Sequence, residues 1–219
     1  MAGSPPSPSA SPGGPARTRR TQQERRDGTR LKLLEATVEC LVELGSARLT
    51  TLAVAQRADV SHGALFKHFP TKAGLLAAAV EHLFPRLIAE YQAEFAGLPG
   101  VPPEERITQA IERLWRVYQR PELLAAIELY VAARTDAELA AALSAVDPPH
   151  RRRLHQVARE LFPDVAEQHP GFDALIELIL NAVQGAAVGG AALPANPDHP
   201  RMLRLLARLA RDLFAAPPP

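Results

Sequence analysis

The stretch from Leu49 to Lys72, LTTLAVAQRADVSHGALFKHFPTK, constrains the fold more than any other part of the chain. It has the pattern of two short helices, a tight corner between them, and the first turn of a third helix. Thr50 or Thr51 would cap the first helix and Ser61 the second, because a hydroxyl there accepts from free backbone N–H groups of the first turn. Pro70 would end the second helix, since the residue before a proline is disfavoured in the α region. Such a pair predicts a helix-turn-helix, whose second helix can enter the major groove of DNA.

The two faces of the predicted second helix differ in chemistry. We expect Ala64, Leu65 and Phe66 to be buried. The first helix would bury the apolar side chains of Leu52, Val54, Ala55 and Ala58. The outer face of the second helix is small and polar and consists of Ser61, His62, Gly63, Lys67 and His68. Two packed helices with a solvated outer face have the same pattern, so the spacing alone does not require DNA binding.

Three pieces of this stretch, TTLAVAQRADVS, GALFKHF and PTK before a long helix, resemble the DNA-binding region of the TetR family of bacterial transcriptional regulators. The resemblance covers residues 30–76, and the remainder is similar only in the number and length of its helices. Asp59 stands where the family usually has glycine, and Phe66 where it usually has tyrosine. Aspartate tolerates left-handed backbone, so we expect the turn to form, whereas the phosphate contact of the tyrosine hydroxyl would be missing.

The resemblance implies an all-α fold. An N-terminal three-helix helix-turn-helix domain would be joined by a long helix to a helical domain for ligand binding and dimerisation. We expect a disordered, basic N-terminal arm over residues 1–28, the helix-turn-helix domain over 29–76, and the effector-binding and dimerisation domain over 77–216.

A cluster of basic residues precedes the first predicted helix. Residues 1–16 are rich in Ser, Pro and Gly, which predicts disorder. The segment from Arg17 to Lys32 has seven basic and two acidic side chains, a net charge of +5. Besides a solubilising tail, this composition suits a flexible arm that lies along DNA and releases counterions, with Arg25 and Arg26 among its contacts.

We expect base contacts and phosphate contacts from different residues. The predicted base-reading residues are Ser61, His62, Gly63 and Lys67. The predicted phosphate contacts are Thr50, Thr51, His68, Lys72 and the arginines of the arm. A lysine near a helix N-terminus opposes the helix dipole, so a phosphate partner would explain Lys72. Residues 17–84 hold 11 basic and 7 acidic side chains, and residues 85–219 hold 14 and 17, as expected when one end meets phosphate.

Apolar residues at helical spacing predict helices along the remaining chain. The expected ranges are about 29–44, 72–97, 104–119, 122–134, 136–145, 148–162, 171–192 and 200–214. Gly45 stands where a glycine often ends a helix. Pro85 predicts a kink in the long helix, or a break between two helices.

The last two predicted helices are apolar around more than one stripe, which indicates burial against both their own core and a second subunit. The resemblance implies that they pair across a two-fold axis as a four-helix bundle. The expected dimer-interface residues are Leu175, Leu178, Ile179, Val183, Leu203, Leu206, Leu209 and Leu213. A monomeric helical core is the alternative.

The resemblance also implies a small-molecule effector among the middle helices, whose binding changes the angle of the long helix. The large amphipathic side chains available to line its pocket are Tyr91, Trp115, Tyr118 and Tyr130, each of which has core packing as its alternative role. The apolar setting favours a hydrophobic or aromatic effector, with no cofactor; a protein effector is the alternative. We therefore expect a homodimeric repressor on a palindromic double-stranded DNA operator, with half-sites about 34–36 Å or a multiple apart.

The sequence contains none of the phosphate-loop, nucleophile-elbow or zinc-protease motifs. His150 and His155 would lie about 140° apart on a helix, too far to share a metal. A helical enzyme without a recognisable motif is the alternative class. Cys40 is the single cysteine, which suits a reducing cytoplasm. We expect no stretch approaching the ~20 apolar residues of a membrane span, no signal peptide and a cytoplasmic, bacterial protein.

Overall fold

The computed structural model describes residues 21–192 and 199–215, and within these ranges the chain forms helices and no strands. The predicted all-α fold is confirmed. The helices are α1 (Gln22–Arg48), α2 (Thr51–Arg57), α3 (His62–His68), α4 (Lys72–Phe95), a 3-10 turn (Leu98–Gly100), α5 (Pro103–Tyr118), α6 (Pro121–Ala133), α7 (Ala137–Ser144), α8 (Asp147–Leu161), α9 (Pro163–Gln168), α10 (Phe172–Ala192) and α11 (His199–Ala215).

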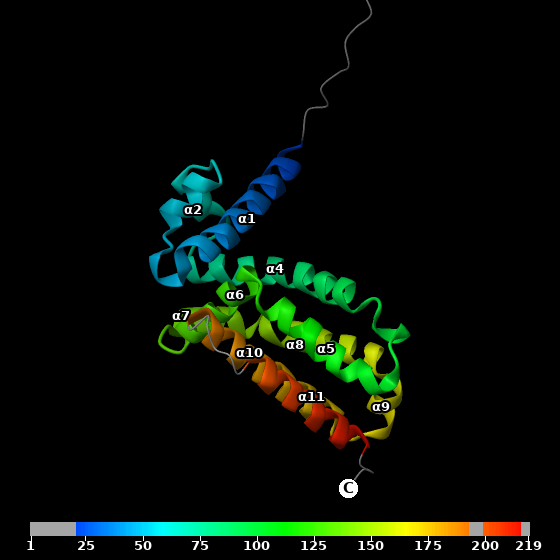
Figure 1. The fold of residues 1–219 in the computed structure, drawn as a ribbon. Coiled ribbons are helices and arrows are strands. Elements are labelled where there is room, and N and C mark those ends of the chain that lie inside the picture. Colours follow the sequence, from blue (N-terminus) through cyan, green and yellow to red (C-terminus); the bar gives the residue numbers. More distant parts are fainter. Residues whose placement is uncertain (1–20, 193–198, 216–219) are drawn as a thin grey trace, which may run out of the picture.

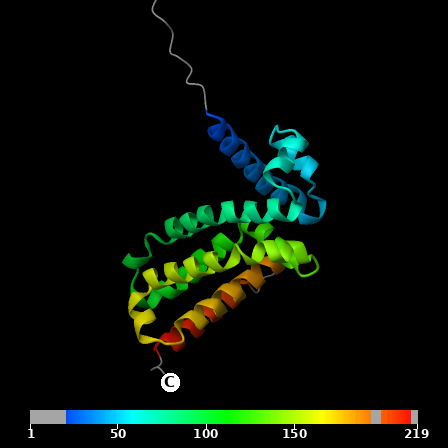
Figure 2. The same cartoon turned by 180° about the vertical axis from the view of Figure 1, so that it is seen from behind.

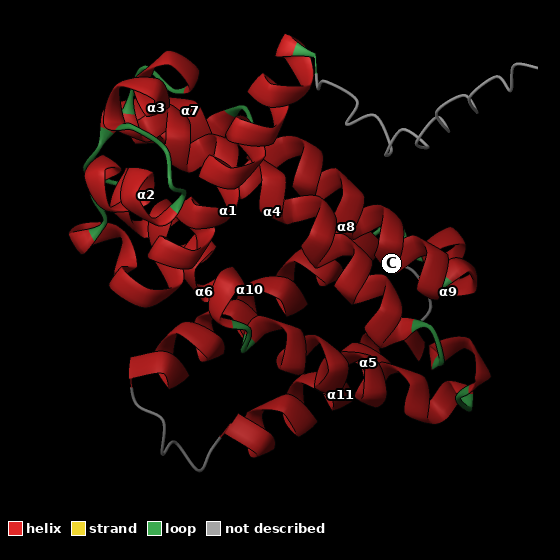
Figure 3. Ribbon diagram, turned by 90° about the horizontal axis from the view of Figure 1, so that it is seen from above, coloured by secondary structure: helices red, strands yellow, loops and turns green. Residues whose placement is uncertain are grey.

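The first three helices form a small group at one end of the molecule (Figure 1). Helix α4 begins beneath this group and runs along the larger body of helices α5 to α11, an arrangement that is also visible from behind (Figure 2). Helices α10 and α11 lie on the side of the body away from α4. Seen from above, α2 and α3 lie at one end and α9 at the other (Figure 3). The long helix therefore connects the helix-turn-helix with the remaining chain.

Helix α1 begins earlier than the apolar pattern predicts. Thr21 and Glu24 form a capping box: the Thr21 hydroxyl accepts from the Glu24 N–H at 3.1 Å, and the Glu24 carboxylate accepts from the Thr21 N–H at 2.7 Å. The predicted disordered arm is therefore wrong for residues 22–28, and Arg25 and Arg26 project from a helix. The part of the predicted arm over residues 1–20 lies outside the described residues.

Among residues 21–192 and 199–215, two have a positive φ, and both turn the chain around α2 and α3. Gly45, at φ 72°, departs from helical geometry near the end of α1, where a glycine was predicted to end the helix. Asp59, at φ 52°, makes the turn between α2 and α3. The predicted left-handed backbone at Asp59 is confirmed.

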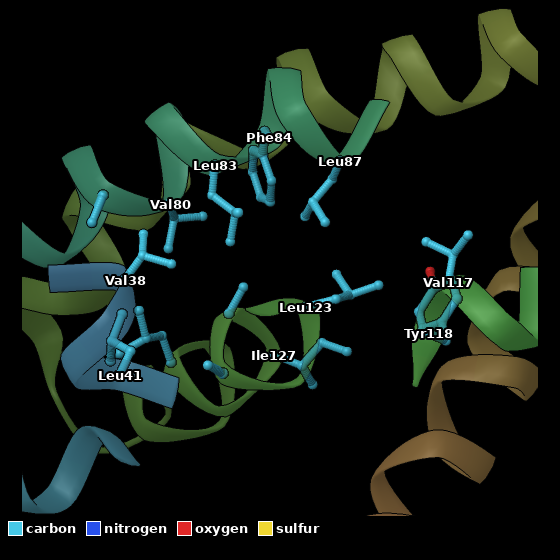
Figure 4. Close-up of a cluster of buried hydrophobic side chains, with 14 of the residues drawn as sticks. Val38, Leu41, Val80, Leu83, Phe84, Leu87, Val117, Tyr118, Leu123 and Ile127 are labelled. Atoms are coloured by element: carbon cyan, nitrogen blue, oxygen red, sulfur yellow. The ribbon is translucent and has the colours of Figure 1, made fainter. Parts of the chain in front are cut away.

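One hydrophobic core joins the helix-turn-helix to the larger body. Side chains from α1, α4, α5 and α6 meet in it (Figure 4). Its labelled members are Val38, Leu41, Val80, Leu83, Phe84, Leu87, Val117, Tyr118, Leu123 and Ile127. Because α1 packs on both α4 and α6, the floor of the helix-turn-helix is in direct contact with the larger body.

Several local predictions are wrong. Helix α4 continues through Pro85, so the alternative that this proline separates two helices is wrong, whereas the kink stays a prediction. Leu52 and Phe66 were expected to be buried but are 51% and 40% exposed, because other side chains fill the apolar sides of α2 and α3. The 3-10 turn and α9 were not predicted, since both are too short to show an apolar period.

Helix α10 has the composition of a membrane span over Phe172–Ala191, with a mean hydropathy of 1.5. The expectation that no stretch approaches such a span is therefore wrong. The helix packs against α5, α8, α9 and α11, and its Asp173 and Glu177 bind Arg159 and Arg151 of α8. These contacts place α10 in a helical bundle in which its ionic side chains have partners.

Candidate nucleic-acid interface and regulatory cavities

The starts of α2, α3 and α4 are each capped by a hydroxyl. Thr50 accepts from the Ala53 N–H at 3.1 Å, Ser61 from the Ala64 N–H at 3.2 Å, and Thr71 from the Gly74 N–H at 3.0 Å. These predicted caps are confirmed, with Thr50 rather than Thr51 capping α2. Leu65 is fully buried, so the opposite side of α3 faces outward.

The outer face of α3 carries the four predicted base-reading residues, all of them exposed: Ser61, His62, Gly63 and Lys67. The Nε2 atom of His62 is 3.0 Å from the Thr51 hydroxyl of α2. The His62 ring also packs edge-on against Phe66, with ring centroids 4.9 Å apart. Thr51 and Phe66 therefore hold His62 in place, which neither residue was predicted to do.

The first turns of α1 bring positive charge beside the end of α3. The Arg30 guanidinium lies 4.6 Å from the centre of the Phe69 ring. Burial lowers the pKa of His68 from its ordinary value, and the charges of Arg26 and Arg30 lower it further. In the free protein, the neutral form of His68 is therefore favoured.

Lys72 has a partner within the protein. Its ammonium donates to the Leu49 carbonyl at 2.7 Å and so fastens the start of α4 to the segment before α2. This bond explains a lysine at a helix N-terminus without a phosphate. An ammonium has three donors, so the remaining two are free to reach DNA.

Two neighbouring cavities lie within the larger body. One, of about 80 Å³, is lined mainly by apolar side chains of α4, α5, α8, α10 and α11. The other, of about 130 Å³, is bordered by Tyr91, Tyr118 and Tyr130. Three of the four predicted pocket residues thus come together. Trp115 does not join them; it packs edge-on against His199, with ring centroids 5.1 Å apart.

The sequence pattern did not indicate the polar lining of the second cavity. It consists of Asp147, His150, Arg151, Asn181 and Gln184. These residues lie on α8 and α10, which are separated in the chain. Their spacing within each helix resembles that of solvated residues, so only the packing of the two helices could identify them.

The predicted dimer residues divide into two sets. Leu178, Leu209 and Leu213 are 56%, 50% and 52% exposed on the outer side of α10 and α11. The rest do not belong to this outer face: Ile179, Val183, Leu203 and Leu206 are buried in the protomer's own core, and Leu175 is partly buried. Leu205 is 54% exposed and was missed, although its spacing of four from Leu209 places it on the same face. We call Leu178, Leu205, Leu209 and Leu213 the outer leucine face.

In the part of the chain that the structure describes, no group of three or more His, Cys, Asp or Glu side chains is arranged so that it could hold a metal ion. His155 binds Asp173 and Glu177 at 3.2 and 2.7 Å. Arg151 and Arg159 complete this set of ion pairs between α8 and α10. The cluster joins two helices by charge pairing.

The sequence of this chain, including the segment that forms α2 and α3, is similar to sequences of known proteins. The sequence profile described as bacterial regulatory proteins, tetR family, matches residues 33–79. An HTH-type transcriptional regulator of Mycobacterium tuberculosis is 32% identical over 190 residues, which cover 87% of this chain and 96% of that protein. The HTH-type transcriptional regulator CymR of Pseudomonas putida is 30% identical over 203 residues, 90% and 96% of the two chains. The chain belongs to the tetR family of bacterial transcriptional regulators.

More distant matches extend this picture. The HTH-type transcriptional repressor KstR of Mycolicibacterium smegmatis is 36% identical over 103 residues, 47% of this chain and 48% of that protein. The multidrug binding protein EbrR, solved in complex with imidazole, shares the fold with a TM-score of 0.59 at 20% identity, and the match covers 82% of this chain and 93% of EbrR. A tetR-family regulator from Rhodococcus has a TM-score of 0.64 at 19% identity, and the match covers 87% of this chain and 100% of that regulator. The chain is thus a DNA-binding transcriptional regulator and not an enzyme.

Proposed function

We propose that this protein is a ligand-responsive repressor that binds a palindromic or near-palindromic operator as a homodimer in the bacterial cytoplasm. The observation that carries this proposal is the outer face of α3, where Ser61, His62, Gly63 and Lys67 are all exposed. On its other side, Leu65 is fully buried. Base contacts from this face, and phosphate contacts from the first turns of α1, would fit one major groove and its border.

Dimerisation is supported by the outer leucine face. Four leucines, each at least half exposed, line one side of α10 and α11. An apolar surface of this kind is typical of a protein interface. Pairing of two copies through it would create a four-helix bundle and place two α3 helices on a two-fold operator, with half-sites about 34–36 Å or a multiple apart.

Repression is supported by the similarity to a protein named as a repressor, KstR. A small-molecule response is supported by the two cavities and by the fold that this chain shares with EbrR, a multidrug binding protein. Helix α6 supplies Ile127 and Tyr130 to the larger cavity and also packs on α1. A ligand that prefers a different position of α6 would tilt α1 and, with it, the helix-turn-helix; a ligand with equal affinity for both states would change nothing.

The experiment that tests DNA recognition is selection of bound duplexes from a random pool. The expected result is enrichment of an inverted repeat. The variant Lys67→Ala would relax the preference at one position of each half-site, or weaken binding to all sequences if Lys67 contacts phosphate. Failure to enrich any duplex would contradict the proposal. The selected repeat, sought upstream of the protein's own gene, would then identify the operator.

A further inference from the structure

The two cavities have three lining residues in common. Tyr91 of α4, Leu154 of α8 and Leu180 of α10 border both of them. On one side of these residues the lining is apolar and includes Phe95, Ile111 and Phe214. On the other side the lining includes hydroxyl, imidazole, carboxylate and amide groups. The two cavities are therefore adjacent, one with an apolar lining and the other with a partly polar lining.

Two buried polar atoms at the polar end have no hydrogen-bond partner among the described residues: the Tyr130 hydroxyl and Nδ1 of His150. Buried polar atoms are almost always paired in native proteins. The His150 ring stacks on Phe84, with centroids 3.6 Å apart and planes 11° apart, which fixes the direction of the unpaired nitrogen. Phe84, Leu123 and Ile127 line the same cavity (Figure 4). The unpaired nitrogen of His150 is therefore held in position at the border of this cavity.

The charged groups at the polar end already have partners. Arg151 binds Asp147 and Glu177, both at 2.9 Å. Burial lowers the pKa of His150 to about 4, so its ring is neutral at pH 7. Burial raises the pKa of the Tyr130 hydroxyl, and the nearby Asp147 carboxylate raises it further, so the hydroxyl remains a donor. Asp147 does not meet the geometry of a hydrogen bond to this hydroxyl, which leaves the donor available to a ligand. A charged ligand would have to displace one of the existing ion pairs, whereas a neutral ligand would not.

We propose that these cavities form one binding chamber for a neutral molecule with an apolar body and one hydrogen-bonding head, such as a hydroxyl or carbonyl group. The body lies in the apolar end, and the head accepts from the Tyr130 hydroxyl and pairs with Nδ1 of His150. Cavities of about 80 and 130 Å³ compare with the ~150 Å³ apolar cavity that binds benzene. The ligand is therefore about one ring in size with a short chain. This inference rests on the proposed ligand-responsive function.

The test is isothermal titration calorimetry of the full chain at pH 7 with four matched probes: 4-butylphenol, 4-butylbenzoate, 4-butylbenzylamine and butylbenzene. The expected result is that 4-butylphenol binds at least tenfold more tightly than the anionic and the cationic probe. Equal or tighter binding of either charged probe, or no binding of any probe, would overturn the proposal.

The variant Tyr130→Phe removes the unpaired hydroxyl and keeps the ring. The loss of one hydrogen bond should weaken 4-butylphenol about two- to tenfold and leave butylbenzene unchanged. An unaltered affinity for 4-butylphenol would contradict the assigned head group. At the apolar end, Ala158→Leu adds bulk and should weaken both probes. If the Ala158→Leu protein does not fold, Ala110→Leu, which narrows the same end from α5, is used in its place. If whichever of these two variants folds binds 4-butylphenol with normal affinity, the two cavities do not act as one chamber.

Operator release is measured separately, by fluorescence anisotropy of the selected DNA. A probe that binds the chamber without releasing DNA contradicts the switch but leaves the chamber intact. If the protein binds the probes but no DNA, the proposed function as a DNA-binding repressor is contradicted and the chamber is not. The two failures are therefore distinguishable.

Discussion

Glu128 of α6 accepts hydrogen bonds from both the backbone N–H and the hydroxyl of Ser46, at 2.9 and 2.8 Å. Ser46 lies just after the departure from helical geometry at Gly45, close to the start of α2. A Cβ on Gly45 would lie 3.2 Å from the Glu128 carboxylate, so glycine also gives this carboxylate room. Because α6 also borders the cavity of about 130 Å³ that Tyr130 and His150 line, Glu128 connects the wall of that cavity to the helix-turn-helix.

The first prediction concerns this contact. Glu128→Ala should lower the free energy of unfolding by about 0.5–1 kcal/mol, since the bonds are charge-assisted but exposed. Amide hydrogen exchange should become faster over residues 46–58 and stay unchanged in α11. Glu138→Ala, on exposed α7 surface, is the matched control. Equal exchange in both variants would show that the contact does not hold α2.

The second prediction concerns the position of His62. Thr51→Val keeps the shape of the side chain and removes the hydroxyl that pairs with His62. Stability should change by less than ~0.5 kcal/mol, as for most surface substitutions, while the preferred base at one operator position should change in a duplex selection. Thr50→Ala, which removes the cap of α2, should instead cost about 1 kcal/mol and weaken all sequences alike. An unchanged base preference in Thr51→Val would remove His62 from base reading.

The third prediction concerns the positive charge at the start of α1. If Arg25 and Arg26 each contact one phosphate, replacing both with glutamine should make the slope of log K against log salt shallower by about 0.9 per residue. Glutamine suits a helix nearly as well as arginine, so the capping box should survive. Arg152→Gln on α8 should leave the slope unaltered. A double variant with the slope of the original protein would exclude these contacts.

The fourth prediction concerns the outer leucine face. Leu209→Glu should convert a dimer to a monomer in light scattering, because a carboxylate would have to be desolvated at the centre of an apolar interface. The helical content measured by circular dichroism should be retained, since Leu209 is half exposed in the protomer. Val131→Glu, at a 61% exposed position on α6, should leave the mass unchanged. A dimeric Leu209→Glu protein would place the interface elsewhere.

The fifth prediction concerns pH. Burial lowers the pKa of His155, but hydrogen bonds to Glu177 and Asp173 outweigh this effect, so the pKa lies above 6.5. The protonated form is thus favoured by folding, and its stabilisation is complete below pH 6.5 and lost as the pH rises through the raised pKa. Arg151 and Arg159 bind the same two carboxylates and keep their charge throughout this range.

Urea unfolding at about pH 6, 7 and 8 checks this sign. Stability should decline with rising pH in the original protein and decline less in His155→Gln. His82→Gln on α4 is the control. His150 acts in a different range: its pKa of about 4 makes folding less favourable as the pH falls from 6.5 towards 4. A His155→Gln protein with the original decline above pH 6.5 would refute the assignment.

Much of the helix-turn-helix could be predicted because its signals are local. The caps at Thr50 and Ser61 depend on a hydroxyl and the N–H groups within three residues of it, and the turn at Asp59 depends on its own backbone preference. The early start of α1 also had a local signal, the Thr21 and Glu24 spacing of a capping box, which the basic charge of the segment obscured. The exposure of Phe66 had none, because it depends on Leu65 and Phe69 filling the space beneath α3.

The sequence by itself determined where most helices form, where they turn, and that the end nearest α3 is basic, because propensity, capping and charge act between neighbours in the chain. Only the tertiary structure decided which leucines of α10 and α11 face outward. When a helix is apolar on several sides, its sequence does not indicate which side packs against the core of its own protomer. The tertiary structure also decided that Tyr130 and His150 meet around one cavity, that Lys72 binds the Leu49 carbonyl, and that Glu128 reaches Ser46. Each of these contacts joins residues that the chain separates, so it exists only once the helices have packed.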